Sequence, residues 1–248
     1  MNPVIPLLLG TLLCVAVPSL VAQTVVNVDP SGHWEGTIQA PNMEVVIGMD
    51  LAMNHNGQLA GTFAQPSNGV KALPFSTVAV EGQSLRLVLK PSSGGGTFNG
   101  TVSKDGTSMS GDFITAEGGY SLRFTLARTG DAMIAPAPRS APIGKELEGT
   151  WNGTLEAGER QLRIVLKMAN QLDGTATGTI VSGDGSGVEI PIAITQKGSN
   201  VTIDVPAVGA TFVGIVNTAG TELVGTWTQG PSVLPLTFRR AAASRDGR

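Results

Sequence analysis

The chain carries one sequence pattern twice, and this repeat constrains its fold more than any other feature. Trp34-Glu-Gly-Thr-Ile38 returns as Trp151-Asn-Gly-Thr-Leu155, and Gly111-Asp-Phe113 returns as Gly225-Thr-Trp227. The offset is 117 residues for the first pair and 114 for the second. A unit of roughly a hundred residues is too long for a solenoid repeat and has the size of a small domain. We therefore expect two tandem copies of one domain.

Each copy consists of short runs in which apolar and polar residues alternate. Leu162, Ile164 and Leu166 share one face of such a run, with Arg163 and Lys167 on the other. A period of two indicates strands with one buried face, and the Asn-Gly and Asp-Gly pairs between runs favour hairpin turns. No room is left for crossover helices, so sequential strands should pair antiparallel. The predicted fold is all-β: two tandem small antiparallel β-barrels, lipocalin-like, with about eight short strands in each.

The ends of the chain and the segment between the repeats differ in composition from the repeats. The first 22 residues contain no charged side chain and include the apolar run Val4 to Val17, as in a secretory signal peptide; an uncleaved membrane anchor is the alternative. Prolines recur between the copies and favour an extended, semi-rigid spacer. The predicted organisation is a signal peptide at 1–22, a first β-barrel domain at 23–128, a Pro-rich linker at 129–146, a second β-barrel domain at 147–241 and a disordered tail at 242–248.

Charge and cysteine content exclude several classes of function. The net charge is −3, with no basic stripe, which argues against a nucleic-acid partner. The only cysteine, Cys14, lies in the signal segment, so the mature chain is expected to form no disulfide and to offer no thiol nucleophile. These features predict a secreted or periplasmic bacterial protein that contacts a membrane only if the signal segment is uncleaved.

Residues that could support catalysis are scarce. The two histidines, His33 and His55, are expected to be solvated loop side chains, and neither a Gly-x-Ser-x-Gly elbow nor a Cys/His cluster is present. A catalytic site would have to use carboxylates alone, for example Glu156, Glu159, Asp184 and Glu189, which lie on predicted polar faces and turns. We predict a protein that is not an enzyme and that uses no metal and no cofactor.

The few aromatic residues are the candidates for ligand contact. They occupy apolar strand positions in both copies, where they either fill the barrel interior or line a cavity within it. A filled interior is the more common arrangement. If an interior cavity exists, the residues expected to line it are Trp34, Phe98, Phe113, Trp151, Phe212 and Trp227.

The second copy resembles a known domain. The segments that carry the resemblance are Leu147 to Leu155, Leu162 to Leu166, Val188 to Ile192, Val205 to Gly214, Gly220 to Gly230 and Leu234 to Arg239. In this order they are similar to the N-terminal all-β accessory domain of many secreted bacterial serine hydrolases of the α/β-hydrolase fold. The resemblance implies a fold and a compartment. It transfers no catalytic residue, because the family's Ser, Asp and His belong to the hydrolase domain that follows.

Two functional hypotheses follow from these observations. The first is a non-catalytic binding or accessory module, in which two linked domains engage a repeated ligand or oligomeric partner and gain avidity. The alternative is a carrier of a small apolar ligand, with one ligand inside each barrel. The partner is accordingly an unknown protein or a small apolar molecule.

Overall fold

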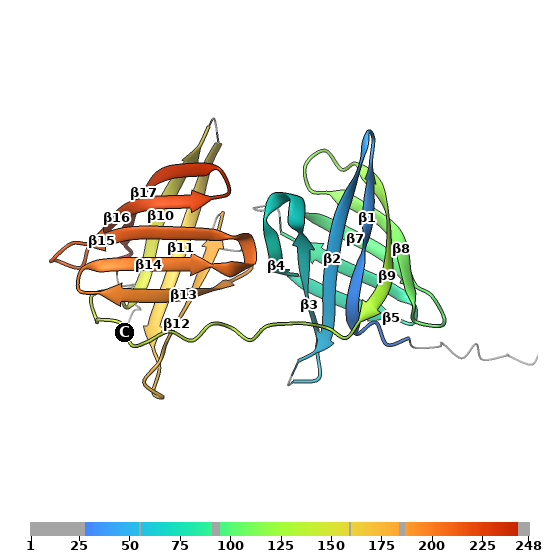
Figure 1. Ribbon diagram of the computed structural model, residues 1–248, viewed down its shortest axis with the longest axis horizontal. Helices are drawn as coiled ribbons and strands as arrows, with labels where there is room; N and C mark the ends of the chain where they lie inside the picture. Colours follow the sequence, from blue (N-terminus) through green and yellow to red (C-terminus); the bar gives the residue numbers. More distant parts are fainter. Residues whose placement is uncertain (1–27, 55, 91–94, 159, 184–186, 243–248) are drawn as a thin grey trace, which may run out of the picture.

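The computed structural model describes residues 28–54, 56–90, 95–158, 160–183 and 187–242 (Figure 1). The predicted signal peptide, with Cys14, lies outside the described residues, as do His55, Glu159, Asp184 and the tail from residue 243. The described chain is all-β and forms two antiparallel sheets joined by the linker, which confirms the predicted fold class. Within this part of the chain, no helix has the length and apolar character that a membrane span needs.

The first sheet contains nine strands, one more than the sequence predicts. They are paired in the order β4-β3-β2-β1-β9-β8-β7-β6-β5. Their bounds are β1 (Gly32–Ala40), β2 (Met43–Met53), β3 (Leu59–Gln65), β4 (Val70–Pro74), β5 (Thr77–Glu81), β6 (Ser84–Leu89), β7 (Gly96–Val102), β8 (Ser108–Thr115) and β9 (Ser121–Gly130).

The extra strand arises because one strand of the first copy is broken. β4 and β5 are the two edges of the curled sheet, and they do not pair with each other along a ladder. The two residues between them still donate backbone hydrogen bonds to both neighbouring strands, from Phe75 to Gly61 over 3.0 Å and from Ser76 to Val88 over 2.8 Å. The first copy is therefore a curled sheet that no strand ladder closes, rather than the closed barrel that the sequence predicts. Its two edges meet at a seam at Phe75–Ser76, and we refer to this curled sheet as the first barrel.

The second sheet is a closed barrel of eight strands, as predicted. Closure depends on a short ladder of three residue pairs between the first and the last strand. The strand bounds are β10 (Gly149–Ala157), β11 (Arg160–Asn170), β12 (Ala176–Ser182), β13 (Ile190–Lys197), β14 (Asn200–Val205), β15 (Ala210–Val216), β16 (Glu222–Gln229) and β17 (Ser232–Arg240). Strand β13 pairs first with β12 and then with β14 without a break. In the first copy two separate strands make the equivalent pairings, β4 with β3 and β5 with β6.

A tryptophan fills the same end of each barrel, with an arginine beside it. Trp34 and Trp151 are fully buried, and each indole Nε1 donates a hydrogen bond of 2.9 Å to the backbone carbonyl four residues earlier. The guanidinium carbon of Arg240 lies 4.5 Å from the Trp151 ring centroid, and that of Arg128 lies 6.0 Å from the Trp34 ring centroid. The Arg240 guanidinium also donates to the carbonyls of Gly220, Glu146 and Glu148. These contacts close one end of each barrel.

The linker is bound to both sheets instead of acting only as a spacer. Near its start, the Met133 amide donates a 2.7 Å hydrogen bond to Asp50 of β2. Near its end, Ser140 exchanges backbone hydrogen bonds with Ala176 of β12, and Ile143 is buried. The Asn170 side chain of β11 both accepts from the Ile143 amide and donates to its carbonyl. Arg139 also pairs with Asp173 over 2.9 Å, so only residues 134–138 run between the two anchored parts, along one side of the molecule (Figure 1).

Candidate functional site: a cavity between the two barrels

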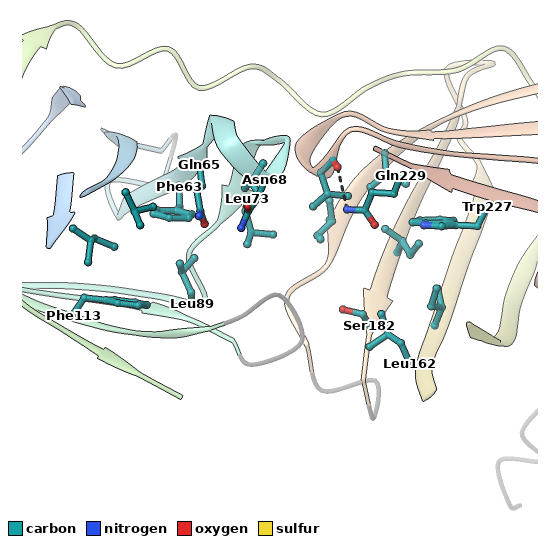
Figure 2. Close-up of a pocket in the computed structure, with 18 of the residues that line it drawn as sticks. Phe63, Gln65, Asn68, Leu73, Leu89, Phe113, Leu162, Ser182, Trp227 and Gln229 are labelled. Atoms are coloured by element: carbon teal, nitrogen blue, oxygen red, sulfur yellow. Dashed lines mark hydrogen bonds between the residues drawn. The ribbon is translucent and has the colours of Figure 1, made fainter. Parts of the chain in front are cut away.

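The open ends of the two barrels meet around one cavity of about 370 Å³. This volume lies in the usual range for small-molecule sites. Figure 2 shows Phe63, Leu89 and Phe113 of the first copy on one side, and Leu162 and Trp227 of the second copy on the other. The cavity thus belongs to both copies and not to either barrel alone.

Equivalent positions of the two copies line this cavity. Six positions contribute a residue from each copy: Val45 and Leu162, Phe63 and Ile180, Gln65 and Ser182, Leu73 and Ile190, Leu89 and Val205, and Phe113 and Trp227. These lining positions lie at the end of the barrel opposite the closed end. In the β1–β2 hairpin, Ile38 and Val45 pair near the turn and both line the cavity. Trp34, which fills the closed end, pairs with Met49 further from the turn. The same end of each copy therefore faces the other copy.

Two short 3-10 turns hold the copies together beside the cavity. One is η1 (Pro66–Asn68), which leads into β4, and the other is η3 (Pro206–Val208), which packs against β4. Gly69 and Gly209 end these turns in the left-handed region, with φ of 70° and 59°. A Cβ atom built on Gly209 would lie 3.3 Å from the carbonyl oxygen of Gly69, so the two turns approach closely across the boundary.

The lining is apolar with a few neutral polar groups. Four side chains, Gln65, Asn68, Ser182 and Gln229, bring amide or hydroxyl groups to the cavity. Gln229 donates to the Val208 carbonyl over 3.2 Å. None of the described residues that line the cavity carries a charge. An apolar surface with a few convergent polar groups is the usual character of a small-molecule site.

Trp227 is the one lining residue with an unsatisfied buried donor among the residues described. Its indole Nε1 is shielded from solvent and has no hydrogen-bond partner. The other two tryptophans both donate to a backbone carbonyl. An unpaired buried N–H costs about 1–3 kcal/mol, so such groups are rare and need a reason.

The structure places the six predicted ligand residues in three groups of two. Phe113 and Trp227 line the cavity. Trp34 and Trp151 fill the closed ends, as described above. Phe98 and Phe212 fill the barrel interiors: Phe98 packs on Phe113 and Phe124, with centroids 4.4 and 5.2 Å away, and Phe212 packs on Phe238 at 5.3 Å. With both interiors filled at these points, the space that remains is shared between the barrels.

Sequence reasoning missed most of the cavity lining. Some of the missed aliphatic residues, such as Leu162 and Ile164, belong to runs that were predicted to face inward. An alternating pattern, however, does not show which inward position lies at an open end. The polar residues Gln65, Asn68 and Gln229 sit where strands β3 and β16 meet turns, and such positions are commonly polar in any β protein. The repeat itself was the usable signal, since it pairs Phe113 with Trp227.

No titratable side chain of the described residues is part of the cavity lining. His33 lies in β1, not in a loop, and its Nδ1 is 2.8 Å from Asp50 Oδ1. Burial lowers the pKa of His33, but the hydrogen bond and charge of Asp50, assisted by Glu35, outweigh this effect and raise the pKa above its ordinary value. On β11, the Lys167 ammonium donates a 2.5 Å hydrogen bond to Glu189 and holds the pKa of that carboxyl below its usual range.

No three His, Cys, Asp or Glu side chains gather where they could hold a metal ion, as far as the described residues go. The Glu156 carboxylate, one of those considered for catalysis, is exposed and accepts a hydrogen bond from Gln161. No polar or charged side chain in the described part of the chain is fully buried.

Comparison with known proteins adds little to this description. No protein-family model matches the chain, and no curated protein matches it. Among solved structures, the chain is similar to a protein of Bacteroides fragilis provisionally assigned to the outer membrane, with 12% identity over 85% of this chain and 97% of that chain and a TM-score of 0.28. It is also similar to a protein of unknown function from Nostoc punctiforme, with 18% identity over 85% and 96% of the two chains and a TM-score of 0.27.

A third similar structure is the isotype 1 transferrin binding protein B of serogroup B Neisseria meningitidis. The identity is 12%, the match covers 84% of this chain and 52% of that chain, and the TM-score is 0.24. TM-scores this low do not bear on function, so the conclusions below rest on the geometry of the cavity.

Proposed function

We propose that this chain is a non-catalytic binding protein that holds one small, largely apolar ligand in the cavity between its two barrels. The observation that carries the proposal is a cavity of about 370 Å³ lined by equivalent residues of both copies. Binding there would remove apolar surface of the ligand from water, which is worth about 25 cal/mol for each Å² buried.

The arrangement of the copies favours one shared ligand over two ligands bound separately. An avidity mechanism needs two equivalent surfaces that can engage a partner at the same time. Here the equivalent open ends face each other and are occupied in forming the cavity. A carrier with one ligand in each barrel is likewise disfavoured, because Phe98 and Phe212 fill the barrel interiors.

The compartment and the wider relationship belong to the same proposal. The uncharged apolar segment at 1–22 supports a secreted or periplasmic location. The resemblance of residues 147–239 to the accessory domain of secreted serine hydrolases supports the same compartment and a non-catalytic role.

Titration with the neutral apolar dye N-phenylnaphthylamine tests the proposal, because its fluorescence rises on transfer from water to an apolar site. We expect saturation at one dye per chain. Val45→Phe in the first copy and Leu162→Phe in the second each fill part of the cavity, and either substitution alone should abolish dye binding. Val46→Phe is the matched control, since Val46 is the next residue on β2 and its side chain is 59% exposed.

Three results would contradict the proposal. One is the binding of two dyes per chain, with each cavity-filling substitution removing one of them. This result would mean that each barrel has a separate site. Another is dye binding that survives both substitutions. The last is the absence of dye binding by the folded wild-type protein.

A further inference from the structure

We infer that the outer face of strands β13 to β17, here called the outer sheet face, is the interface of a homodimer in which two copies of this chain pack across a two-fold axis. Figure 1 shows these five strands side by side across the front of the second barrel, with β10 to β12 crossing behind them. They form one wall of the barrel, and two such walls can pack face to face. None of the outward residues of this wall lines the cavity, so the inference goes beyond the proposed function.

The centre of the outer sheet face is apolar and exposed. Ile215 of β15 pairs with Val224 of β16, and Val213 lies two residues from Ile215 on the same side of its strand. These three side chains and Val233 are each more than half exposed. The nine outward positions of β15 to β17 carry no charge: Thr211, Val213, Ile215, Val224, Thr226, Thr228, Val233, Pro235 and Thr237. A contiguous uncharged area of this kind indicates an interaction surface.

The fold does not require apolar residues on this face, because the first copy has polar ones at the same places. The equivalents of Val213, Ile215 and Val224 are Asn99, Thr101 and Ser110, which are also exposed. Two further equivalents, Asp112 and Arg123, are charged and lie 3.6 Å apart as an ion pair. The apolar surface is therefore specific to the second copy, and its cause must lie outside the barrel itself.

The rows of this face complement one another when a second copy packs on it. The register aligns the outward residues in three rows across the strands, and the middle row contains Thr202, Val213, Thr226 and Pro235. A two-fold axis along the middle row places Val213 against the partner's Val213. It also exchanges the two outer rows, so Thr211 lies over the partner's Ile215 and Thr228 over the partner's Val224. Each of these aliphatic side chains thus meets another Val or the methyl group of a Thr.

Charges at the β13 edge of the face favour this orientation of the axis. Asp204 lies in one outer row, and Lys197 lies in the other, on the neighbouring strand. Exchange of the outer rows brings Lys197 of each copy within one strand spacing, about 4.8 Å across the sheet, of the partner's Asp204. The dimer then contains two ion pairs between the copies. A two-fold axis along β15 would instead place both charges opposite threonines, Thr228 and Thr237.

The size of the face predicts weak association. Five strands and three rows cover about 24 by 20 Å, so two faces together bury about 1,000 Å², which is the lower limit for a specific interface. We therefore expect a dissociation constant of about 10–100 µM. A dimer of this strength forms only where the protein is concentrated.

Sedimentation equilibrium of the chain without the predicted signal peptide, from about 1 µM to 1 mM, measures this association. We expect a monomer–dimer equilibrium. A triple variant that takes the residues of the first copy, Val213→Asn, Ile215→Thr and Val224→Ser, should weaken the dimer at least about tenfold. The first copy folds with these residues on the same strands, and circular dichroism checks that the variant is folded. Val46→Asn is the matched control, since Val46 is equally exposed but lies on the first barrel.

Two further variants test the orientation of the axis. Lys197→Glu alone should weaken the dimer about tenfold, and adding Asp204→Lys should restore it, because the two ion pairs are then reversed rather than lost. Val213→Cys places a thiol at the axis. Because Cys14 lies in the predicted signal peptide, this thiol is the only one in the secreted chain, and a short bismaleimide should link two copies. The control Val46→Cys should remain unlinked.

Several results would overturn the inference. A chain that stays monomeric up to 1 mM has no such interface, and a dimer that the triple variant leaves unchanged uses another surface. Association beyond the dimer would contradict a closed two-fold arrangement. If the reversed pair of charges fails to restore the dimer and Val213→Cys does not cross-link, the assigned axis is wrong.

Discussion

The three tryptophans provide a test of which contacts stabilise the two barrels. Replacement by Phe keeps an aromatic ring at each site and removes the indole N–H. For Trp151 the losses are the hydrogen bond to the Leu147 carbonyl, packing of the larger ring, and part of the interaction with Arg240, whose guanidinium carbon lies 4.5 Å from the ring centroid. A buried hydrogen bond contributes about 1 kcal/mol, and a cation–π contact about 0.5–2 kcal/mol. With the lost packing, Trp151→Phe should cost about 3 kcal/mol of unfolding free energy.

The other two sites should follow in a fixed order. Trp34→Phe removes an equivalent hydrogen bond, but Arg128 stands 6.0 Å from the Trp34 ring, at the limit of a useful cation–π distance, so the expected cost is about 2 kcal/mol. Trp227→Phe removes no hydrogen bond from the unliganded protein and should cost about 1 kcal/mol or less, from packing alone.

Urea unfolding followed by far-ultraviolet circular dichroism measures these costs without depending on tryptophan emission. The two barrels can unfold in separate transitions, and each transition is then identified by the variants that move it. The reasoning would be refuted if Trp227→Phe were as damaging as Trp151→Phe, or if Trp34→Phe proved the most damaging of the three.

Three further predictions concern other contacts. A Cβ on Gly36 would lie 2.0 Å from a backbone carbonyl oxygen of β9, so Gly36→Ala should lower the unfolding free energy by about 3 kcal/mol, whereas Gly48→Ala, with no atom nearer than 3.6 Å, should change urea unfolding little. Because the folded-state pKa of His33 is raised, the stabilising contribution of this residue is complete below the unfolded pKa of about 6.5 and is lost as the pH rises through the folded pKa. Asp50→Asn should weaken this pH dependence of unfolding, because only the smaller effect of Glu35 would then raise the pKa. Asn170→Ala removes both hydrogen bonds to Ile143 and should make the linker markedly more sensitive to limited proteolysis, and unchanged cleavage would contradict its anchoring role.

The fold could be predicted from the sequence because its pattern is local. The positions Ile164, Leu166 and Met168 alternate on one strand and are all buried in the structure, as predicted. The turns predicted at Asn-Gly and Asp-Gly pairs were readable for a similar reason, since Gly57, Gly106 and Gly174 all adopt a positive φ where two strands reverse. Strands and turns of this kind depend on the spacing of neighbouring residues, so they can be predicted without knowledge of the rest of the chain.

The seam in the first barrel also had a sequence signal, although it is easily overlooked. In the second copy, Ile190, Ile192 and Ile194 keep one phase along the unbroken strand β13. In the first copy, Leu73 and Phe75 share a phase, but Val78, which packs against the core, falls on the opposite one. A shift of one residue moves the inward face of a strand, so the chain must break between the two phases.

The shared cavity was beyond sequence reasoning because it depends on how the two barrels are placed. Their placement follows from individual contacts: the docking of Ser140 and Ile143 on the second barrel, and the approach of Gly69 and Gly209 across the boundary. These residues belong to turns and a linker, where no periodic pattern specifies a partner. The residues at the barrel ends could be recognised as inward-facing, but not as facing one another.

Equivalent ends meet here, as they also do in an isologous homodimer, in which one patch contacts its own copy across a two-fold axis. In a true homodimer both halves have the same sequence, so the two walls of a cavity between them must carry the same residues. Covalent fusion of the halves lifts that obligation, so the two walls can differ residue by residue, as Phe113 and Trp227 do at one pair of equivalent positions.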